Sequence, residues 1–441
     1  MSADYFFELA DALFRELPDD ERLQINFSGE HSDFARLNHN RIRQAGHVHQ
    51  GEVSLDLIQG SKHVEAQLEL CWDPAADQKR LQALLERLRE QRRFLPEDPH
   101  LMVPDTVQST DERHSSELPD AGLMLEDIHA AADGLDLVGI LATGDIQRGF
   151  ANSLGQKNWY QRSNVHFDWS VYLDDEHRDK AVKRQLADFQ WRPEQLQRKM
   201  SEVREQLEIL RKPAIKLPPD HYPVYLSPDA LVEILGMMAW GGFGLKSHKT
   251  GNSPLIRMVR DGRTLSPLLH LKEDTAGGVA PGFTGAGFIK QPEVSLIEYG
   301  SYNDYLVGPR SAREYAAPIT GSESPQSLSM APGVLPANHV VEALGEGLLI
   351  NNLWYCNFSD RADCRITGMT RFACFWVSGG RIQAPIEVLR FDDSVYQLLG
   401  DQLAALTDHA ELLLDDSTYG ERSTASYRLP GALIEVMRFT L

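Results

Sequence analysis

Residues 217–240 read LPPDHYPVYLSPDALVEILGMMAW and contain the clearest break in the chain. Lys212-Pro213 just before it and the prolines at its start end a long charged helix that is predicted to run to about Arg211, because proline lacks the backbone N–H that a helix needs. A short strand is expected at 223–226. Ser227 and Pro228 then form a helix start, with serine as N-cap and proline at the first helical position. We therefore expect a domain boundary just before this stretch.

The N-terminal domain, residues 1–217, is predicted to combine an antiparallel sheet with packed helices. Apolar residues recur at helical spacing over 3–17 and again around 81–88, whereas they alternate with polar residues over 23–71. The acidic, proline-rich stretch 94–119 has no period and is predicted to be a long exposed loop. Further expected elements are a helix at 122–133, strands at 135–141 and 148–152 around a turn at Gly144-Asp145, and a strand at 161–173. A long charged helix follows, and its apolar seam consists of Leu196, Met200, Val203, Leu207 and Leu210. We expect this helix to pack on its own domain.

The C-terminal domain, residues 218–441, is predicted to be strand-rich and barrel-like, with few helices. Its content of glycine, serine and proline is higher, and it has two expected loops, at 276–287 and 318–337. The other expected elements are a hairpin over 372–388 with a Gly379-Gly380 turn, a helix at 394–406 and a final strand at 432–441. Together the two domains predict an α+β fold.

The composition excludes several classes of function. The chain has 441 residues, with 44 Lys and Arg against 64 Asp and Glu, which gives a net charge of −20. Such an acidic surface repels phosphate backbones and makes nucleic-acid binding a poor expectation. Four cysteines are too few for a disulfide framework, no apolar run is long enough to cross a bilayer, and the N-terminus has no basic segment typical of a signal peptide. We therefore expect a cytoplasmic protein that binds neither nucleic acid nor membrane.

The histidines offer no recognisable metal motif. No His-Glu dipeptide occurs, so neither HExxH nor HExxxH is possible. His47 and His49 lie two residues apart on an expected strand and therefore point to one face, with His39 nearby. This spacing suits metal ligation. However, no acidic or cysteine partner is close in sequence, and we favour a polar strand face.

Other candidate motifs are also incomplete. Cys356, Cys364 and Cys374 form no C-x-x-C pair, and we interpret them as packing residues rather than a zinc site. The stretch 151–155, ANSLG, lacks the first glycine of a nucleophile elbow and is read as a turn. The glycine-rich loop 276–287 lacks the Lys-Ser/Thr ending of a phosphate-binding loop. Residue chemistry alone therefore provides no evident catalytic set.

Several segments together resemble the TldD/PmbA family. Each is short, but they follow one another in the same order and spacing over nearly the whole chain. They are residues 33–42, DFARLNHNRI; 151–155, ANSLG; 223–230, PVYLSPDA; 328–333, LSMAPG; 347–350, GLLI; and 375–386, FWVSGGRIQAPI.

The resemblance implies which type of family member this chain is. TldD-type members are zinc peptidases with an HExxxH helix directly after the Leu-Ser-Pro element and a cysteine ligand near the C-terminus, whereas TldE-type (PmbA-type) members lack them. The TldD pattern places its two histidines at Gly236 and Gly241, its glutamate at Met237 and its cysteine near Tyr419. None of these residues can ligate zinc or act as a general base. The chain therefore resembles a TldE-type subunit without catalytic residues or a metal of its own.

The family also implies a partner and a substrate. A TldE-type chain pairs with a TldD-type chain that supplies the zinc, and the resulting chamber holds an extended or unfolded peptide. If this chain shapes that chamber, we expect polar peptide contacts from Arg36, Asn38, Asn152 and Arg371. The stretch 354–371 departs from better-known members, which suggests a distinct branch with a different substrate and leaves open whether the chain pairs with a TldD-type chain or with itself.

Two other functions stay open from the sequence. One is a self-sufficient, homodimeric hydrolase that uses Cys356 or Cys364 with a histidine brought near by folding. The other is a regulatory binding protein that acts on DNA or a topoisomerase, as an older family name suggests. The net charge of −20 argues against direct DNA binding.

Overall fold

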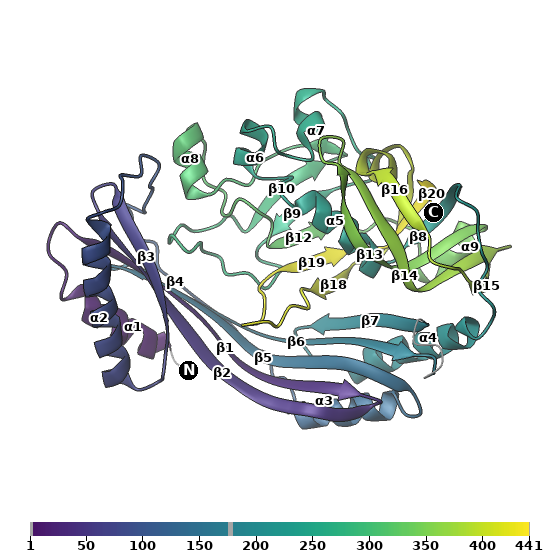
Figure 1. Cartoon of the computed structure of the whole chain (residues 1–441), viewed down its shortest axis with the longest axis horizontal. Helices are drawn as coiled ribbons and strands as arrows, with labels where there is room; N and C mark the ends of the chain where they lie inside the picture. Colours follow the sequence, from purple (N-terminus) through teal and green to yellow (C-terminus); the bar gives the residue numbers. More distant parts are fainter. Residues whose placement is uncertain (1–2, 175–179, 441) are drawn as a thin grey trace.

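The structure is a computed structural model, and it describes residues 3–174 and 180–440. The N-terminal half of the chain forms one strongly curved sheet, and the C-terminal half lies over its concave side (Figure 1). The sheet has the strand order β3-β2-β1-β5-β6-β4, and β7 pairs with β6. Its strands are β1 (Arg22–Asn38), β2 (Arg41–Gln59), β3 (Lys62–Glu69), β4 (Thr110–His114), β5 (Asp136–Asn152), β6 (Lys157–Tyr172) and β7 (Ala181–Asp188).

Four helices cover the convex face of this sheet, at its two ends. At one end, α1 (Ala3–Phe14) and α2 (Pro74–Arg92) pack on a core that includes Phe27 and Trp159. At the other end, α3 (Ala121–Ala131) and α4 (Pro193–Leu210) pack on a core that includes Phe167. The apolar seam of α4 is buried there, but the same core includes Tyr225 and Phe375 of the C-terminal half. The prediction that this helix packs on its own half is therefore only partly right.

The prediction of a turn at Gly144-Asp145 is wrong, because β5 runs through it without a break. Gly144 has φ +130°, and a Cβ there would overlap the carbonyl oxygen of His31 on the neighbouring strand. This glycine therefore allows a close approach of two paired strands rather than a change of direction.

Two predicted loops contain strands. The stretch 94–119 includes β4, which pairs in parallel with β6, and the stretch 318–337 includes β12 (Ser327–Met330). Both strands are short, since β4 is five polar residues (TDERH) and β12 alternates over only four (SLSM), and runs of this length do not stand out from a loop. The strand β7 was not foreseen either.

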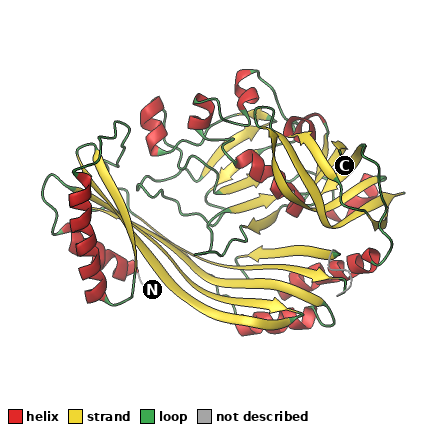
Figure 2. Cartoon of the chain, viewed as in Figure 1, coloured by secondary structure: helices red, strands yellow, loops and turns green. Residues whose placement is uncertain are grey.

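The C-terminal half is strand-rich, as predicted, but its two sheets are open and the described residues form no closed barrel (Figure 2). One sheet has the order β15-β14-β13-β8-β20-β17, with β16 beside β14, and the other β11-β10-β9-β12-β19-β18. The strands not yet given are β8 (His221–Leu226), β9 (Leu271–Asp274), β10 (Glu293–Glu298), β11 (Ser301–Tyr302), β13 (Gly347–Asp360), β14 (Arg365–Ser378), β15 (Arg381–Pro385), β16 (Arg390–Ser394), β17 (Leu403–Leu406), β18 (Glu411–Leu414), β19 (Ser426–Leu429) and β20 (Ala432–Arg438).

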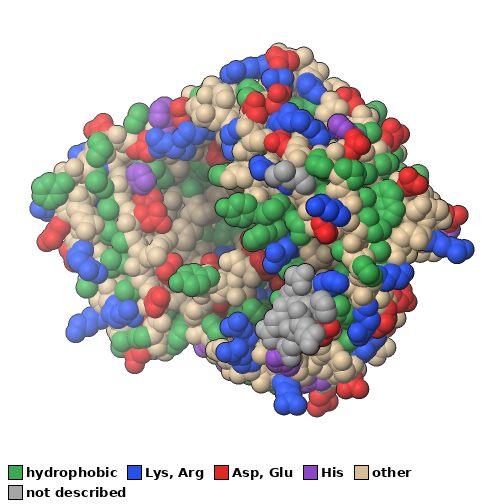
Figure 3. Space-filling view, turned by 45° about the vertical axis from the view of Figure 1, so that its right-hand side comes forward, with side chains coloured by type: hydrophobic (Ala, Val, Ile, Leu, Met, Phe, Trp, Pro, Cys, Tyr) green, Lys and Arg blue, Asp and Glu red, His purple; other side chains and the backbone are tan. Residues whose placement is uncertain are grey.

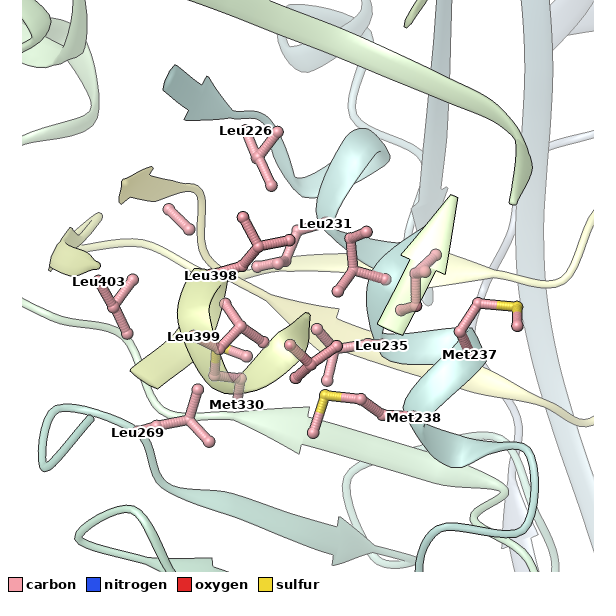
Figure 4. Packing of buried hydrophobic residues seen from close by; sticks show 14 of the residues in the cluster. Leu226, Leu231, Leu235, Met237, Met238, Leu269, Met330, Leu398, Leu399 and Leu403 are labelled. Atoms are coloured by element: carbon pink, nitrogen blue, oxygen red, sulfur yellow. The ribbon is translucent and has the colours of Figure 1, made fainter. Parts of the chain in front are cut away.

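The helix α5 (Pro228–Ala239) lies between these two sheets, and its apolar residues form the middle of the core of this half. Ser227 caps it by accepting a hydrogen bond from the backbone N–H of Ala230 at 3.2 Å, as the sequence predicts. Leu231, Leu235 and Met238 point into the packed interior beside Leu398 and Leu399 (Figure 4). The remaining helices are short: α6 (Leu245–Lys249), α7 (Ile256–Arg260), α8 (Pro309–Tyr315), the 3-10 turn η1 (Ala337–His339) and α9 (Val340–Leu344).

The predicted helix at 394–406 is largely wrong. After β16 the chain makes a helical turn that continues as the π-type turn η2 (Gln397–Asp401), and it then enters β17. Leu403 and Leu406 pair with β20 instead of continuing the helix. Because the leucines of this stretch are buried against both sheets, its apolar pattern fits a helix and a strand equally well. No helix in the described part of the chain is long and apolar enough to span a membrane.

Candidate functional site in the cleft between the two halves

A loop from the C-terminal half reaches across to the concave face of the N-terminal sheet. We call residues 415–425 the strap. Arg422 is 5% exposed, and its guanidinium donates to the Ser32 hydroxyl at 3.3 Å, to the carbonyl of Gly144 at 3.4 Å and to the side chain of Asn164. Burial lowers the pKa of Arg422 to about 10, so it stays charged at neutral pH. The strap therefore joins the two halves by polar contacts.

A charged cluster lies where β6, β7, α5 and the strap meet. Lys183 Nζ lies 3.5 Å from Asp168 Oδ1 and 3.4 Å from Asp416 Oδ2. Burial raises the pKa of Asp168 to about 6; Lys183 opposes this and Asp416 adds to it. Burial also raises the pKa of Glu233 on α5. One ammonium therefore faces several carboxylates, which favours uptake of a proton by the cluster in mildly acidic solution.

The residues at the positions that the family resemblance assigns to the zinc motif do not fit a zinc ion. Gly236 and Met237 lie within α5, and Gly241, with φ +78°, lies beyond its end. A Cβ at Gly241 would come 2.8 Å from a guanidinium nitrogen of Arg361, and one at Gly236 would come 3.9 Å from the hydroxyl of Tyr427. Glycine and a buried methionine offer neither imidazole nor carboxylate.

The fourth position, Tyr419, is 99% exposed on the strap. Across residues 3–174 and 180–440, no group of three or more His, Cys, Asp or Glu side chains could hold a metal ion. The donor chemistry at these positions is therefore not that of a zinc peptidase centre.

Two cavities flank the glycine-rich loop at 281–286, in the region where the surface is hollowed between the two halves (Figure 3). The side chain of Asn26 on β1 donates to the carbonyl of Gly285 at 2.8 Å and so joins the loop to the sheet. The larger cavity, about 510 Å³, has four basic residues in its wall: Arg148, Lys246, Lys290 and Arg310. The smaller, about 300 Å³, has two glutamates in its wall, Glu52 and Glu65, and shares Arg148 and Phe283 with the larger one.

A third cavity, about 520 Å³, lies between β7, α4 and β18. Its wall contains the ion pair between Lys199 Nζ and Glu411 Oε2, at 2.6 Å. The rest of its wall contains both arginines and acidic residues (Arg192, Arg198, Arg428, Asp188 and Glu202), so it has little excess of either charge. The larger cavity beside the loop differs from it in its excess of positive charge.

The structure does not gather the four sequence-predicted peptide contacts. Arg36 and Asn152 lie near opposite ends of the long β1–β5 pair, 12 residues apart in the strand register, or about 40 Å. Asn38 is next to Arg36 at the hairpin end, and Asn152 accepts hydrogen bonds from the backbone N–H groups of Leu154 and Gln156 in a turn. The guanidinium of Arg371 stacks 4.6 Å from the Trp354 ring in the other half. A role for them in peptide binding stays a prediction.

The histidine pair His47 and His49 lies exposed on β2, on a polar strand face, as the sequence-based interpretation expects. His47 Nδ1 lies 2.8 Å from Asp33 Oδ1, and His47 Nε2 lies 2.9 Å from His31 Nε2. His39 does not join them but pairs with Asp136 at 2.7 Å. The acidic partner of His47 is not close in sequence but comes from the facing strand, through the register of β1 and β2.

The three cysteines of the C-terminal half are not activated for nucleophilic attack. Cys364 and Cys374 are buried and Cys356 is half-buried. Burial raises the pKa of the Cys356 and Cys364 thiols to about 12, so both are protonated at neutral pH. This protonation state argues against the cysteine hydrolase.

The basic residues of the larger cavity escaped sequence reasoning because they come from four separate segments. Arg148 lies on β5, Lys246 on α6 and Arg310 on α8, and Lys290 follows the glycine-rich loop. Only that loop stood out in the sequence. On a chain of net charge −20, a local excess of lysine and arginine becomes visible only once folding brings the segments together.

The fold is shared with several solved structures. The chain is similar to TldE from Thermococcus kodakarensis, with 13% identity, 100% of both chains covered and a TM-score of 0.78. It is also similar to two proteins described as candidate modulators of DNA gyrase. The one from Thermotoga maritima has 14% identity and a TM-score of 0.78, and the match covers 99% of this chain and 100% of that chain. The one from Bacteroides thetaiotaomicron has 13% identity and a TM-score of 0.77, and the match covers 99% of this chain and 98% of that chain.

At these identities the likeness establishes the fold alone, and no curated protein matches the chain. The family evidence comes from the sequence. Residues 219–441 match the family model described as the PmbA/TldA metallopeptidase C-terminal domain. That match covers half of the chain, and this protein therefore belongs to the TldD/PmbA family of metallopeptidase-related proteins.

Proposed function

We propose that this chain is the non-catalytic, TldE-type subunit of a zinc peptidase whose metal is held by a TldD-type partner chain. The observation that carries the proposal is the helix α5. Its motif positions hold Gly236 and Met237, and the guanidinium of Arg361 lies where a side chain at Gly241 would go. Without imidazole and carboxylate at these positions, the chain has no means to bind zinc there or to activate water.

In this proposal the chain contributes a wall of the chamber that holds the peptide. The concave sheet, the strap and the loop at 281–286 border open cavities lined by charged, hydroxyl-bearing and apolar side chains. Such a mixed wall suits an extended peptide, which carries both polar and apolar groups. The arrangement with a partner chain, and peptide contacts from Arg36, Asn38, Asn152 and Arg371, belong to the same proposal.

The experiment compares the purified chain with a mixture of this chain and a TldD-type chain encoded beside it. We expect the chain alone to contain no stoichiometric zinc by elemental analysis and to leave unfolded peptides intact. Cleavage should appear with the partner and vanish when the first histidine of the partner's HExxxH motif is replaced. Cleavage by the metal-free chain alone would contradict the proposal.

A further inference from the structure

We propose that the larger cavity beside the 281–286 loop is a carboxylate-binding subsite for peptides. The inference rests on the proposed function only in taking a peptide as the ligand. The wall of the cavity carries the side chains of Arg148, Lys246, Lys290 and Arg310 and a single carboxylate, that of Glu323. An anion entering it therefore meets an excess of positive charge.

Lys290 is the central group of this subsite. It is only 7% exposed, and its ammonium donates to the side-chain oxygen of Gln326, which is a neutral partner. Burial lowers the pKa of Lys290 to about 8, against the opposing effect of Glu273 and Glu112. The ammonium therefore remains largely protonated at pH 7, and a bound carboxylate would relieve the cost of burying its charge.

The other three basic residues differ in whether a carboxylate already pairs with them. Lys246 is exposed, whereas Arg310 pairs with Asp98, and Arg148 lies 3.2 Å from Glu421 in the strap. The one acidic residue in the wall is partly engaged, because Glu323 Oε1 accepts a hydrogen bond from the backbone N–H of Gly308 at 3.0 Å. Lys246 and Lys290 are therefore the two cations best placed to bind a new anion.

The smaller cavity, on the other side of the loop, is less favourable for a carboxylate than the larger one. Its wall contains Glu52 and Glu65, and burial together with Glu421 and Glu69 raises the pKa of Glu52. An anion is repelled there and attracted on the other side of Phe283. The two cavities thus discriminate between the charged groups of one peptide.

The size and the lining indicate what carries the carboxylate. A volume of about 510 Å³ exceeds the need of a bare ion and lies in the range of cavities that hold drug-sized ligands. Pro281 and Phe283 provide apolar surface, and Thr284, Ser311 and Ser322 provide hydroxyls. A peptide has two sources of such a carboxylate, its C-terminus and an Asp or Glu side chain, and the test separates them.

The experiment measures binding of fluorescein-labelled pentapeptides to the full-length chain alone by fluorescence anisotropy. One peptide has a free C-terminal carboxylate and no acidic side chain, the second is its C-terminal amide, and the third is that amide with an internal glutamate. We expect at least one carboxylate-bearing peptide to bind about tenfold more tightly than the neutral amide, in a salt-dependent way. Preference for the first peptide identifies the C-terminus as the source, and preference for the third identifies the side chain.

Variants locate the site. Lys290→Gln and Lys246→Gln should each weaken binding of the preferred peptide about tenfold, and Lys249→Gln should not. Lys249 is the matched control because it is an exposed lysine on the same short helix, α6, and lies outside the cavity wall. Since Lys246 is exposed, its variant remains informative if Lys290→Gln fails to fold.

Equal binding of all three peptides, or unchanged binding by both cavity variants, would overturn the subsite. Tight binding of inorganic phosphate that peptides cannot displace would also overturn it, because it would indicate a site for a different anion. The assay contains neither zinc nor a partner chain. A failure of this subsite and a failure of the partner-dependent peptidase are therefore separate results.

Discussion

The two faces of the N-terminal sheet have opposite chemistry. On the convex face, Phe27 and Trp159 stack at 5.5 Å between ring centroids beneath α1 and α2. On the concave face, the same strands carry Ser28, Ser32 and Asp168, which contact the strap or the charged cluster. Because side chains alternate along a strand, one set of strands can serve a core on one side and a polar cleft on the other. The convex face therefore packs the sheet against its helices, whereas the concave face binds the strap by polar contacts and lines the cavities.

The largest effect that distinguishes the two faces is expected from Phe27→Ala. Phe27 is fully buried on the convex face, with its ring also 5.6 Å from that of Phe6. Removing it should lower the free energy of unfolding by about 3–5 kcal/mol, measured by urea denaturation. Phe94→Ala is the control, since Phe94 is exposed and should change the value by less than about 0.5 kcal/mol. Similar losses for both would contradict the assignment of the core.

The next effect concerns the concave face. Arg422→Met keeps a long side chain but leaves the carbonyl of Gly144 and the side chain of Asn164 without their donor. We expect a loss of about 3 kcal/mol in the free energy of unfolding and faster proteolysis of the strap. Arg381→Met, at an exposed hairpin tip, should change neither. A strap equally protected in both variants would argue against its role in joining the halves.

A pH-dependent effect is expected from Asp168→Asn. The pKa of Asp168 is raised to about 6 in the folded protein, from an ordinary 3.8, so the folded state holds this proton more tightly. Stability from this group is therefore greatest at low pH and falls as the pH rises from about 4 to 6. The variant does not lose stability in this way, because asparagine does not ionise. Its unfolding free energy relative to the wild type should rise by about 1–2 kcal/mol over that window. A difference that does not change with pH would refute the raised pKa.

The smallest effect is expected from Asn26→Ala, which removes the hydrogen bond to the carbonyl of Gly285. Because this contact is exposed, the loss in unfolding free energy should be about 0.5–1 kcal/mol. Hydrogen exchange should accelerate in the 281–286 loop but not in the β1–β2 ladder. Exchange that stays slow in the loop would mean that Phe283, rather than Asn26, holds the loop in place.

Local patterns predicted much of the fold. The stripe of α4, the capped start of α5 and the hairpin at Gly379-Gly380 follow from residues close in sequence, and all three are confirmed. Gly144 shows the limit of such reasoning. A glycine beside aspartate usually marks a turn, yet here a backbone atom from a distant strand explains it. The short strands β4 and β12 were missed because runs of this length do not stand out from a loop.

By itself, the sequence determined the α+β class, the family resemblance and the absence of a His-Glu motif, because these depend on residue identity and on local spacing. Only the tertiary structure decided which charges share a cavity. Lys246, Lys290 and Arg148 are separated by many residues, and their common cavity exists because the C-terminal half folds onto the concave sheet. Electrostatic attraction depends on distance in space, and a linear sequence does not contain that distance.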